Sequence, residues 1–163
     1  MFQPGDKIIY SSSGVCSVEE VAVPPFAGKN EKDRLYYKLR PVGSSETIYV
    51  PVDSPVFMRP IMTREEAEAL VSRIPSIGEE TCSSRSIVML RQQYEAILKD
   101  HSCEGYVALV KGIYMKGHSG KKLGQTDQRY MKRAEDMLYG ELAAALDISP
   151  EDVPEYIKNT IEG

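Results

Sequence analysis

The hydrophobic pattern of the chain changes its period near residue 60, and this change constrains the fold more than any other feature. Before residue 60, short runs of strand-forming residues lie between Gly, Pro, Ser and Asn. After it, apolar residues recur every three or four positions, which is typical of amphipathic helices. The sequence therefore predicts an α+β fold of two modules, an antiparallel β domain at 1–60 and an all-α helical bundle at 61–163.

The first module is predicted to contain four strands in succession. They are expected at residues 6–10, 14–23, 34–40 and 46–50. Turn residues separate them at Gly14, at 28–30 and at 43–45, so a meander forming a curled sheet or small barrel is expected. The segment 53–62 carries Pro55 and Pro60, and we predict a stiff linker outside the sheet there.

The second module is predicted to contain about five helices. The first begins at Thr63, which forms a capping box with Glu66, and it ends before Pro75. Thr126 is the expected N-cap of the longest helix, and Ser149 followed by Pro150 is expected to begin the last one. The remaining helices are predicted at 86–99, 103–116, 127–146 and about 150–161.

Composition limits the class of protein. Apolar residues make up 42% and charged residues 27%, which is near the average for globular proteins. The longest apolar runs are far shorter than the roughly twenty residues that cross a bilayer, and the N-terminus does not read as a signal peptide. Three cysteines at wide spacings fit a reducing compartment better than a disulfide framework. We therefore expect a soluble, cytoplasmic protein. We also expect it to be a monomer.

The charge of the helical module is segregated along the sequence. Residues 84–134 hold ten Lys or Arg and four Asp or Glu, a net +6, whereas 135–163 hold one Lys and eight acids, a net −7. The net charge of −4 therefore does not exclude a nucleic-acid partner, because phosphate binding needs a concentrated positive field. The alternative is that the basic segment is only a solvent-exposed polar face, whose charge is balanced by the acidic tail.

Seven cations flank the glycine-containing turn at 117–120 and form the first group of candidate DNA contacts. The backbone of such a turn can approach phosphates closely while lysine and arginine supply charge. Arg129, Lys132 and Arg133 share one helical face. The candidates are Lys111, Lys116, Lys121, Lys122, Arg129, Lys132 and Arg133.

Five short motifs, in their order and separation, resemble the CarD/CdnL family of bacterial transcription regulators. They are FQPGDKIIY at 2–10, GVCSVEE at 14–20, LYYKL at 35–39, IYVP at 48–51 and RAEDMLYGEL at 133–142. The resemblance spans nearly the whole chain, and its N-terminal module also occurs in the transcription-repair coupling factor. It implies a Tudor-like β domain at 1–60 that binds the β-subunit lobe of RNA polymerase. It also implies a helical domain at 61–163 that contacts promoter DNA beside the transcription bubble and modulates open-complex stability, largely independently of sequence.

The resemblance and the local sequence together suggest contact residues on the β domain. Pro24 and Phe26 lie where the family presents its polymerase-contacting edge, and Tyr49 matches a position that is basic in some relatives. An exposed sheet edge suits strand addition to a partner. The alternative is that Phe26 and Tyr49 close the core of a small barrel.

One departure from the family concerns its minor-groove wedge. Several members carry a Trp before the second helix of the helical domain, whereas this chain contains no Trp and has Ser86 at the matching position. A serine cannot unstack bases as a large apolar side chain can, although Ile87 or Met89 could substitute. Arg85 and Arg91 flank this position and are further candidate DNA contacts, or they keep an exposed helix soluble.

The sequence lacks the usual spacings of metal and nucleotide sites. No Cys-x-x-Cys or His-x-x-x-His pair is present, and the phosphate-loop imitation at 112–119 has His118 where lysine is required. We therefore expect no metal, no cofactor and no enzyme activity. A polymerase-binding adaptor without DNA contact stays open, as does a small hydrolase whose groups converge in a pocket.

Overall fold

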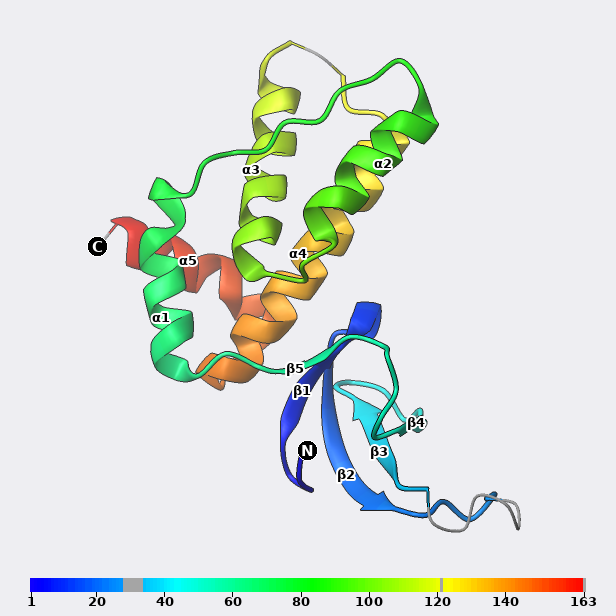
Figure 1. The fold of residues 1–163 in the computed structure, drawn as a ribbon. Helices are drawn as coiled ribbons and strands as arrows, with labels where there is room; N and C mark the ends of the chain where they lie inside the picture. The colour runs from blue at the N-terminus through cyan, green and yellow to red at the C-terminus, as the bar shows by residue number, and fades with distance from the viewer. Residues whose placement is uncertain (28–33, 121, 163) are drawn as a thin grey trace. The chain divides into compact units, whose positions relative to one another are not determined.

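The computed structural model describes residues 1–27, 34–120 and 122–162, and it divides the chain into two compact units, Met1–Ile61 and Met62–Gly163. The first unit is a five-stranded antiparallel sheet, and the second contains five α-helices within the described residues (Figure 1). The predicted α+β fold of two modules is confirmed. Among the described residues, no helix has the length and apolar character that a bilayer crossing requires.

The strands of the first unit follow one another along the sheet, except for the last. Their order is β4-β3-β2-β1-β5. The predicted meander is therefore confirmed for the first four strands. The bounds are β1 Lys7–Tyr10, β2 Val15–Ala22, β3 Tyr36–Pro41, β4 Ile48–Pro51 and β5 Met58–Pro60. The turn predicted at 28–30 lies outside the described residues.

The linker predicted at 53–62 is wrong, because its second half is strand β5. This strand pairs with β1, with Tyr10 opposite Met58 and Ile8 opposite Pro60. Pro60 is tolerated because it ends a strand at the sheet edge, where no further strand needs its missing N–H. The backbone of Ile61 still donates to the Lys7 carbonyl at 3.3 Å, so the sheet unit extends to Ile61.

One face of the sheet carries the core of the first unit. Its side chains alternate with more exposed ones along β3 and β4, as a half-buried antiparallel sheet requires. β1 departs from this pattern, because Ile8 and Ile9 are both buried. Burial raises the pKa of the Cys16 thiol to about 11, so Cys16 is a core residue and not a thiolate. The buried residues are Ile8, Cys16, Val18, Tyr37, Leu39 and Val50.

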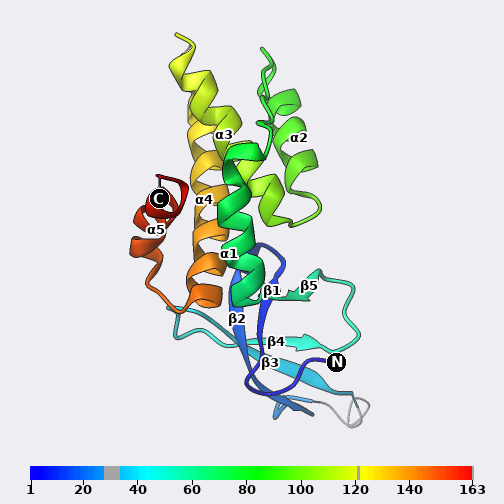
Figure 2. The ribbon, with the colours of Figure 1, turned by 90° about the vertical axis from the view of Figure 1, so that its left-hand side faces the viewer.

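The second unit is organised around α4, its longest helix, which packs against α1, α2, α3 and α5 (Figure 2). The fully buried side chains of this unit include Leu70, Tyr94, Leu109, Ile113 and Leu142. The bounds are α1 Arg64–Arg73, α2 Ile87–Leu98, α3 Cys103–His118, α4 Gln125–Leu146 and α5 Val153–Glu162.

The helix starts were predicted with mixed success. The capping box of α1 is confirmed, since the Thr63 hydroxyl accepts from Glu66 N and the Glu66 carboxylate accepts from Thr63 N, both at 3.1 Å. The prediction of Thr126 as N-cap of α4 is wrong, because the helix begins at Gln125 after Gly124. The last helix is preceded by a 3-10 turn, Pro150–Asp152, so its α-helical part begins at Val153 and not directly after Ser149.

Candidate functional site

The outer face of the sheet, opposite the core, presents a row of polar and aromatic side chains. The strand register places Glu20 opposite Lys38, and Lys38 opposite Tyr49. Ala22 and Tyr36 form the next pair toward the open end of β2 and β3. Successive side chains of a strand alternate between faces, and the neighbours of Tyr36, Lys38 and Tyr49 on β3 and β4 fill the core, so these three residues face outward.

The segment after β2 folds over this outer face. Pro24 is buried, whereas Phe26 is 59% exposed and Tyr49 is 36% exposed. The Phe26 ring meets the rings of Tyr36 and Tyr49 edge to face, with centroids 5.8 and 5.0 Å apart. Neither Phe26 nor Tyr49 belongs to the core cluster of this unit. The structure thus brings two of the three predicted contacts of this domain, Phe26 and Tyr49, together at the surface, whereas Pro24 is buried.

A pocket of about 300 Å³ opens between this segment and the sheet. The prediction from sequence missed its residues other than Pro24 and Tyr49. The strand alternation alone could have indicated Glu20, Tyr36 and Lys38, since all three fall on the outer face once the register is known. Its lining residues are Glu20, Ala22, Val23, Pro24, Pro25, Tyr36, Lys38 and Tyr49.

Ion pairs surround the pocket at the surface. The Glu19 carboxylate lies 2.5 Å from Arg40 Nε and 3.7 Å from Lys38 Nζ. Arg34 lies 3.6 Å from the Asp53 carboxylate, and its guanidinium carbon is 5.8 Å from the centre of the Tyr36 ring. These groups are substantially exposed, so each pair contributes little to stability and can rearrange when a partner binds.

Two of the predicted DNA contacts in the helical unit, Lys111 and Lys116, instead make hydrogen bonds inside the unit. Lys111 donates through Nζ to the carbonyl of Ile74 at 3.0 Å and to that of Ile77, just after α1. Lys111 thereby satisfies carbonyl groups at a helix end, a common role for a lysine.

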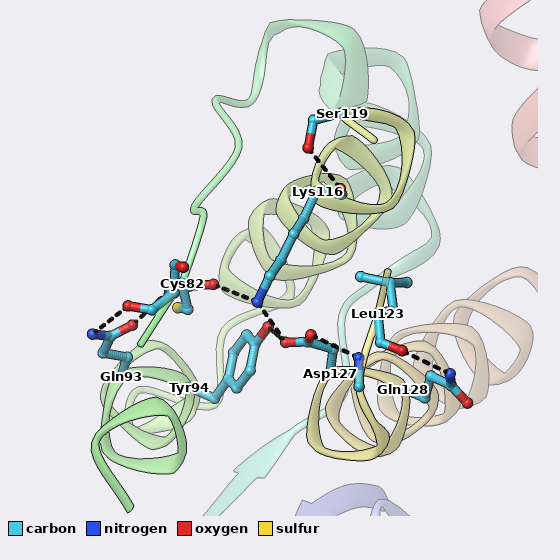
Figure 3. Close-up of polar contacts among 10 residues, drawn as sticks. Cys82, Gln93, Tyr94, Lys116, Ser119, Leu123, Asp127 and Gln128 are labelled. Atoms are coloured by element: carbon cyan, nitrogen blue, oxygen red, sulfur yellow. Dashed lines mark hydrogen bonds and ion pairs between the residues drawn. The ribbon is translucent and has the colours of Figure 1, made fainter. Parts of the chain in front are cut away.

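Lys116 is the centre of a buried polar network that joins α2, α3 and α4 (Figure 3). Its Nζ lies 3.1 Å from both Asp127 Oδ1 and the Cys82 carbonyl oxygen. The Tyr94 hydroxyl donates to the same carboxylate at 2.5 Å, and burial together with this hydrogen bond raises the pKa of Tyr94. Asp127 also accepts from Gly124 N at 3.3 Å, which explains why α4 begins before Thr126.

The other described candidates in this unit are at least partly exposed. Lys132 pairs with Asp136 at 3.0 Å on the surface of α4. Arg133 pairs with Glu95 at 2.7 Å, joining α4 to α2. Within the described residues, no ion pair is formed by Arg85, Arg91, Lys122 or Arg129, which are all exposed. Lys121 lies outside the described residues.

The Glu95 carboxylate is held by two donors. Partial burial raises its pKa, but hydrogen bonds from Tyr130 and Arg133 outweigh burial and lower the pKa overall. The Arg133 guanidinium also lies 5.8 Å from the centre of the Tyr130 ring. Arg133 is therefore oriented by α2 while part of its side chain remains at the surface.

Ser86 is the N-cap of α2, and its hydroxyl accepts from Met89 N at 3.3 Å. The three residues that follow are apolar and exposed, with Ile87 at 58%, Val88 at 61% and Met89 at 50%. Val88 is not among the residues predicted from sequence. The helical spacing from buried Leu90 and Tyr94 turns Val88 and Met89 away from the core. The same spacing places Ile87 on the buried face, so its exposure could not be read from the sequence.

The described residues contain no group of three or more His, Cys, Asp or Glu side chains that could hold a metal ion. The model of the CarD-like/TRCF RID domain family matches residues 2–62, which include the whole sheet unit and the pocket on its outer face. No curated protein matches the chain.

Proposed function

Residues 2–62 belong to the CarD-like/TRCF family of RNA polymerase-interacting domains, and we propose that the chain regulates transcription by holding polymerase and promoter DNA together. The matched family is a non-enzymatic interaction domain. In this proposal, the sheet unit binds the β-subunit lobe of RNA polymerase, and the helical unit contacts DNA at the upstream edge of the bubble. The family match carries the first half of the proposal. The distribution of exposed cations and apolar side chains supports the second.

The proposed polymerase contact is formed by Pro24, Phe26 and Tyr49. Exposed aromatic side chains at a surface are enriched among residues that dominate binding energy. Tyr49 lies on β4, which is one edge of the sheet and can pair with a strand of a partner. The recruited protein would act in the cytoplasm, on the nucleoid, as a monomer.

The proposed DNA contacts are the cations that remain available at the surface of the helical unit. Lys111 and Lys116 leave this set because their amines are engaged inside the unit. Because the polymerase positions the helical unit, each contact can be weak and independent of sequence. The set is Arg85, Arg91, Lys122, Arg129, Lys132 and Arg133, together with Lys121 from the sequence.

The first turn of α2 offers a replacement for the missing Trp wedge. Ile87, Val88 and Met89 are exposed side by side in sequence, and Arg85 and Arg91 flank them. Proteins that kink DNA insert apolar side chains between base steps while nearby cations hold the backbone. We assign this turn to the duplex beside the bubble, where it would stabilise the open complex by about 1–3 kcal/mol, a usual coupling between two binding events.

A second candidate function is a polymerase-binding adaptor that makes no DNA contact. The internal engagement of Lys111 and Lys116 favours it, as do the ion pairs of Lys132 and Arg133. The two functions differ in whether the remaining exposed cations matter.

Replacing four exposed cations should show which of the two candidate functions is correct. We expect a fourfold variant to bind polymerase normally but to give open complexes with a shorter lifetime than wild type on a linear promoter fragment. Its substitutions are Arg85→Ala, Arg91→Ala, Lys122→Ala and Arg129→Ala. The salt slope of DNA binding should fall by about 0.9 for each phosphate that is no longer neutralised. A matched double variant, Lys99→Ala with Lys158→Ala, should keep wild-type activity. If the fourfold variant prolongs open complexes as well as wild type, the adaptor function is correct.

Replacing the exposed apolar residues in the first turn of α2 by serine should reduce the lifetime of open complexes more than it reduces affinity for duplex DNA. The variant Ile87→Ser, Val88→Ser and Met89→Ser removes the apolar wedge but leaves the neighbouring arginines. We expect duplex binding to change less than twofold while open-complex lifetime falls about tenfold, equivalent to about 1.4 kcal/mol. The measurement is dissociation of preformed complexes after addition of a competitor. An unchanged lifetime would exclude this turn as the wedge.

A further inference from the structure

The lining of the pocket on the outer face of the sheet includes two tyrosines and a glutamate, which favour a positive charge, and one lysine, Lys38, which does not. Two of its walls are the side chains of Tyr36 and Tyr49, whose aromatic faces carry negative potential. Pro24 and Pro25 form a rigid apolar wall opposite the sheet. The volume of about 300 Å³ is enough for one long side chain.

The charged groups at the pocket are not equivalent. The Lys38 amine lies 3.7 Å from the Glu19 carboxylate, so its charge is partly compensated. Glu20 lies directly opposite Lys38 in the register, and it is exposed and forms no ion pair with another described residue. The acceptor that remains open to a partner is therefore the Glu20 carboxylate.

We propose that this pocket binds an arginine side chain of RNA polymerase, with its guanidinium against Tyr36 and Tyr49 and ion-paired with Glu20. A guanidinium is planar, stacks on aromatic rings and donates two parallel hydrogen bonds to a carboxylate. The surface beside the pocket already shows this preference, because Arg34 places its guanidinium over the Tyr36 ring. The inference rests on the proposed function for the identity of the partner. The chemistry of the pocket rests on its lining alone.

The pocket chemistry can be tested on the full chain with small probes. Acetyl-arginine methylamide should shift the backbone amide resonances of Tyr36, Lys38 and Tyr49 in a saturable way in ¹⁵N spectra. The citrulline analogue, which has the same shape without the charge, should bind at least about tenfold more weakly, a difference of about 1.4 kcal/mol. Tighter binding of the lysine or glutamate analogue than of the arginine probe would overturn the proposal.

Two matched variants connect the pocket to the polymerase. Glu20→Gln should abolish probe binding and weaken polymerase binding about tenfold, whereas Glu46→Gln, an exposed acid outside the pocket, should change neither. Unchanged spectra elsewhere in the sheet show that each variant is folded. If Glu20→Gln binds polymerase as tightly as wild type, the pocket proposal is wrong while the proposed function stands. If the wild-type chain itself does not bind polymerase, the proposed function fails and the partner is wrong, whereas the arginine preference of the pocket is decided by the probe titration alone.

Discussion

Replacing Gly112 by alanine is expected to destabilise the helical unit strongly, because a methyl group there has no space. A Cβ at this position would lie 1.9 Å from the Glu80 carbonyl oxygen and 2.6 Å from its carbon. Both are backbone atoms, so the segment before α2 must move away from α3. The expected cost is about 1–3 kcal/mol from overpacking alone. Losing the hydrogen bond from Glu80 N to the Ala108 carbonyl would add about 1 kcal/mol.

The matched control is Gly140→Ala in the interior of α4. No heavy atom lies within 4 Å of a Cβ at Gly140, so alanine meets no obstacle there. Because glycine is a poor helix former, this substitution should stabilise the unit by about 0.5–1 kcal/mol. Urea denaturation followed by far-ultraviolet circular dichroism measures both changes. Equal effects of the two substitutions would show that segment 79–82 does not lie against α3 in solution.

The sheet was predictable where its signal was local. Strands β1 to β4 are runs of strand-forming residues between turn residues, and all four were predicted within two residues of their observed bounds. β5 has only three residues and pairs with β1, far away in sequence. No local pattern of Met58 and Pro60 indicates such a partner, so the strand was assigned to the linker.

Helix positions were more predictable than helix starts. Thr63 and Glu66 form a reciprocal motif that is readable from sequence. The start of α4 depends instead on Asp127, whose carboxylate reaches back to Gly124 N while also holding Lys116 and Tyr94. A residue with partners on two other helices cannot be recognised from its neighbours in the chain.

The same limit applies to the candidate contacts. Counting charges placed Lys111 and Lys116 among surface cations, but both lie on the part of α3 that faces segment 74–82, where carbonyl groups need donors. Sequence position gives no information about those carbonyls. Conversely, Phe26 and Tyr49 were grouped by resemblance, and the structure brings their rings into contact.

Removing the lysine of the α2–α3–α4 network should destabilise the unit strongly, because its side chain is only 12% exposed and pairs with a buried carboxylate. Lys116→Met leaves the Asp127 carboxylate buried without its cation and removes the donor to the Cys82 carbonyl. Breaking a buried ion pair from one side costs about 3–5 kcal/mol. Lys132→Met is the control, because the exposed pair with Asp136 is worth about 0–1 kcal/mol.

A second substitution distinguishes loss of the charge pair from loss of packing. Asp127→Asn in the Lys116→Met background removes the uncompensated charge, so the double variant should be more stable than the sum of the single effects by about 0.5–3 kcal/mol. Additive effects would mean that the pair contributes no coupling.

Because Lys116 also holds the Cys82 carbonyl, four residues before the N-cap of α2, the single variant should loosen the turn of Ile87, Val88 and Met89 as well. Hydrogen exchange should therefore quicken at Leu90 in Lys116→Met and stay unchanged in Lys132→Met.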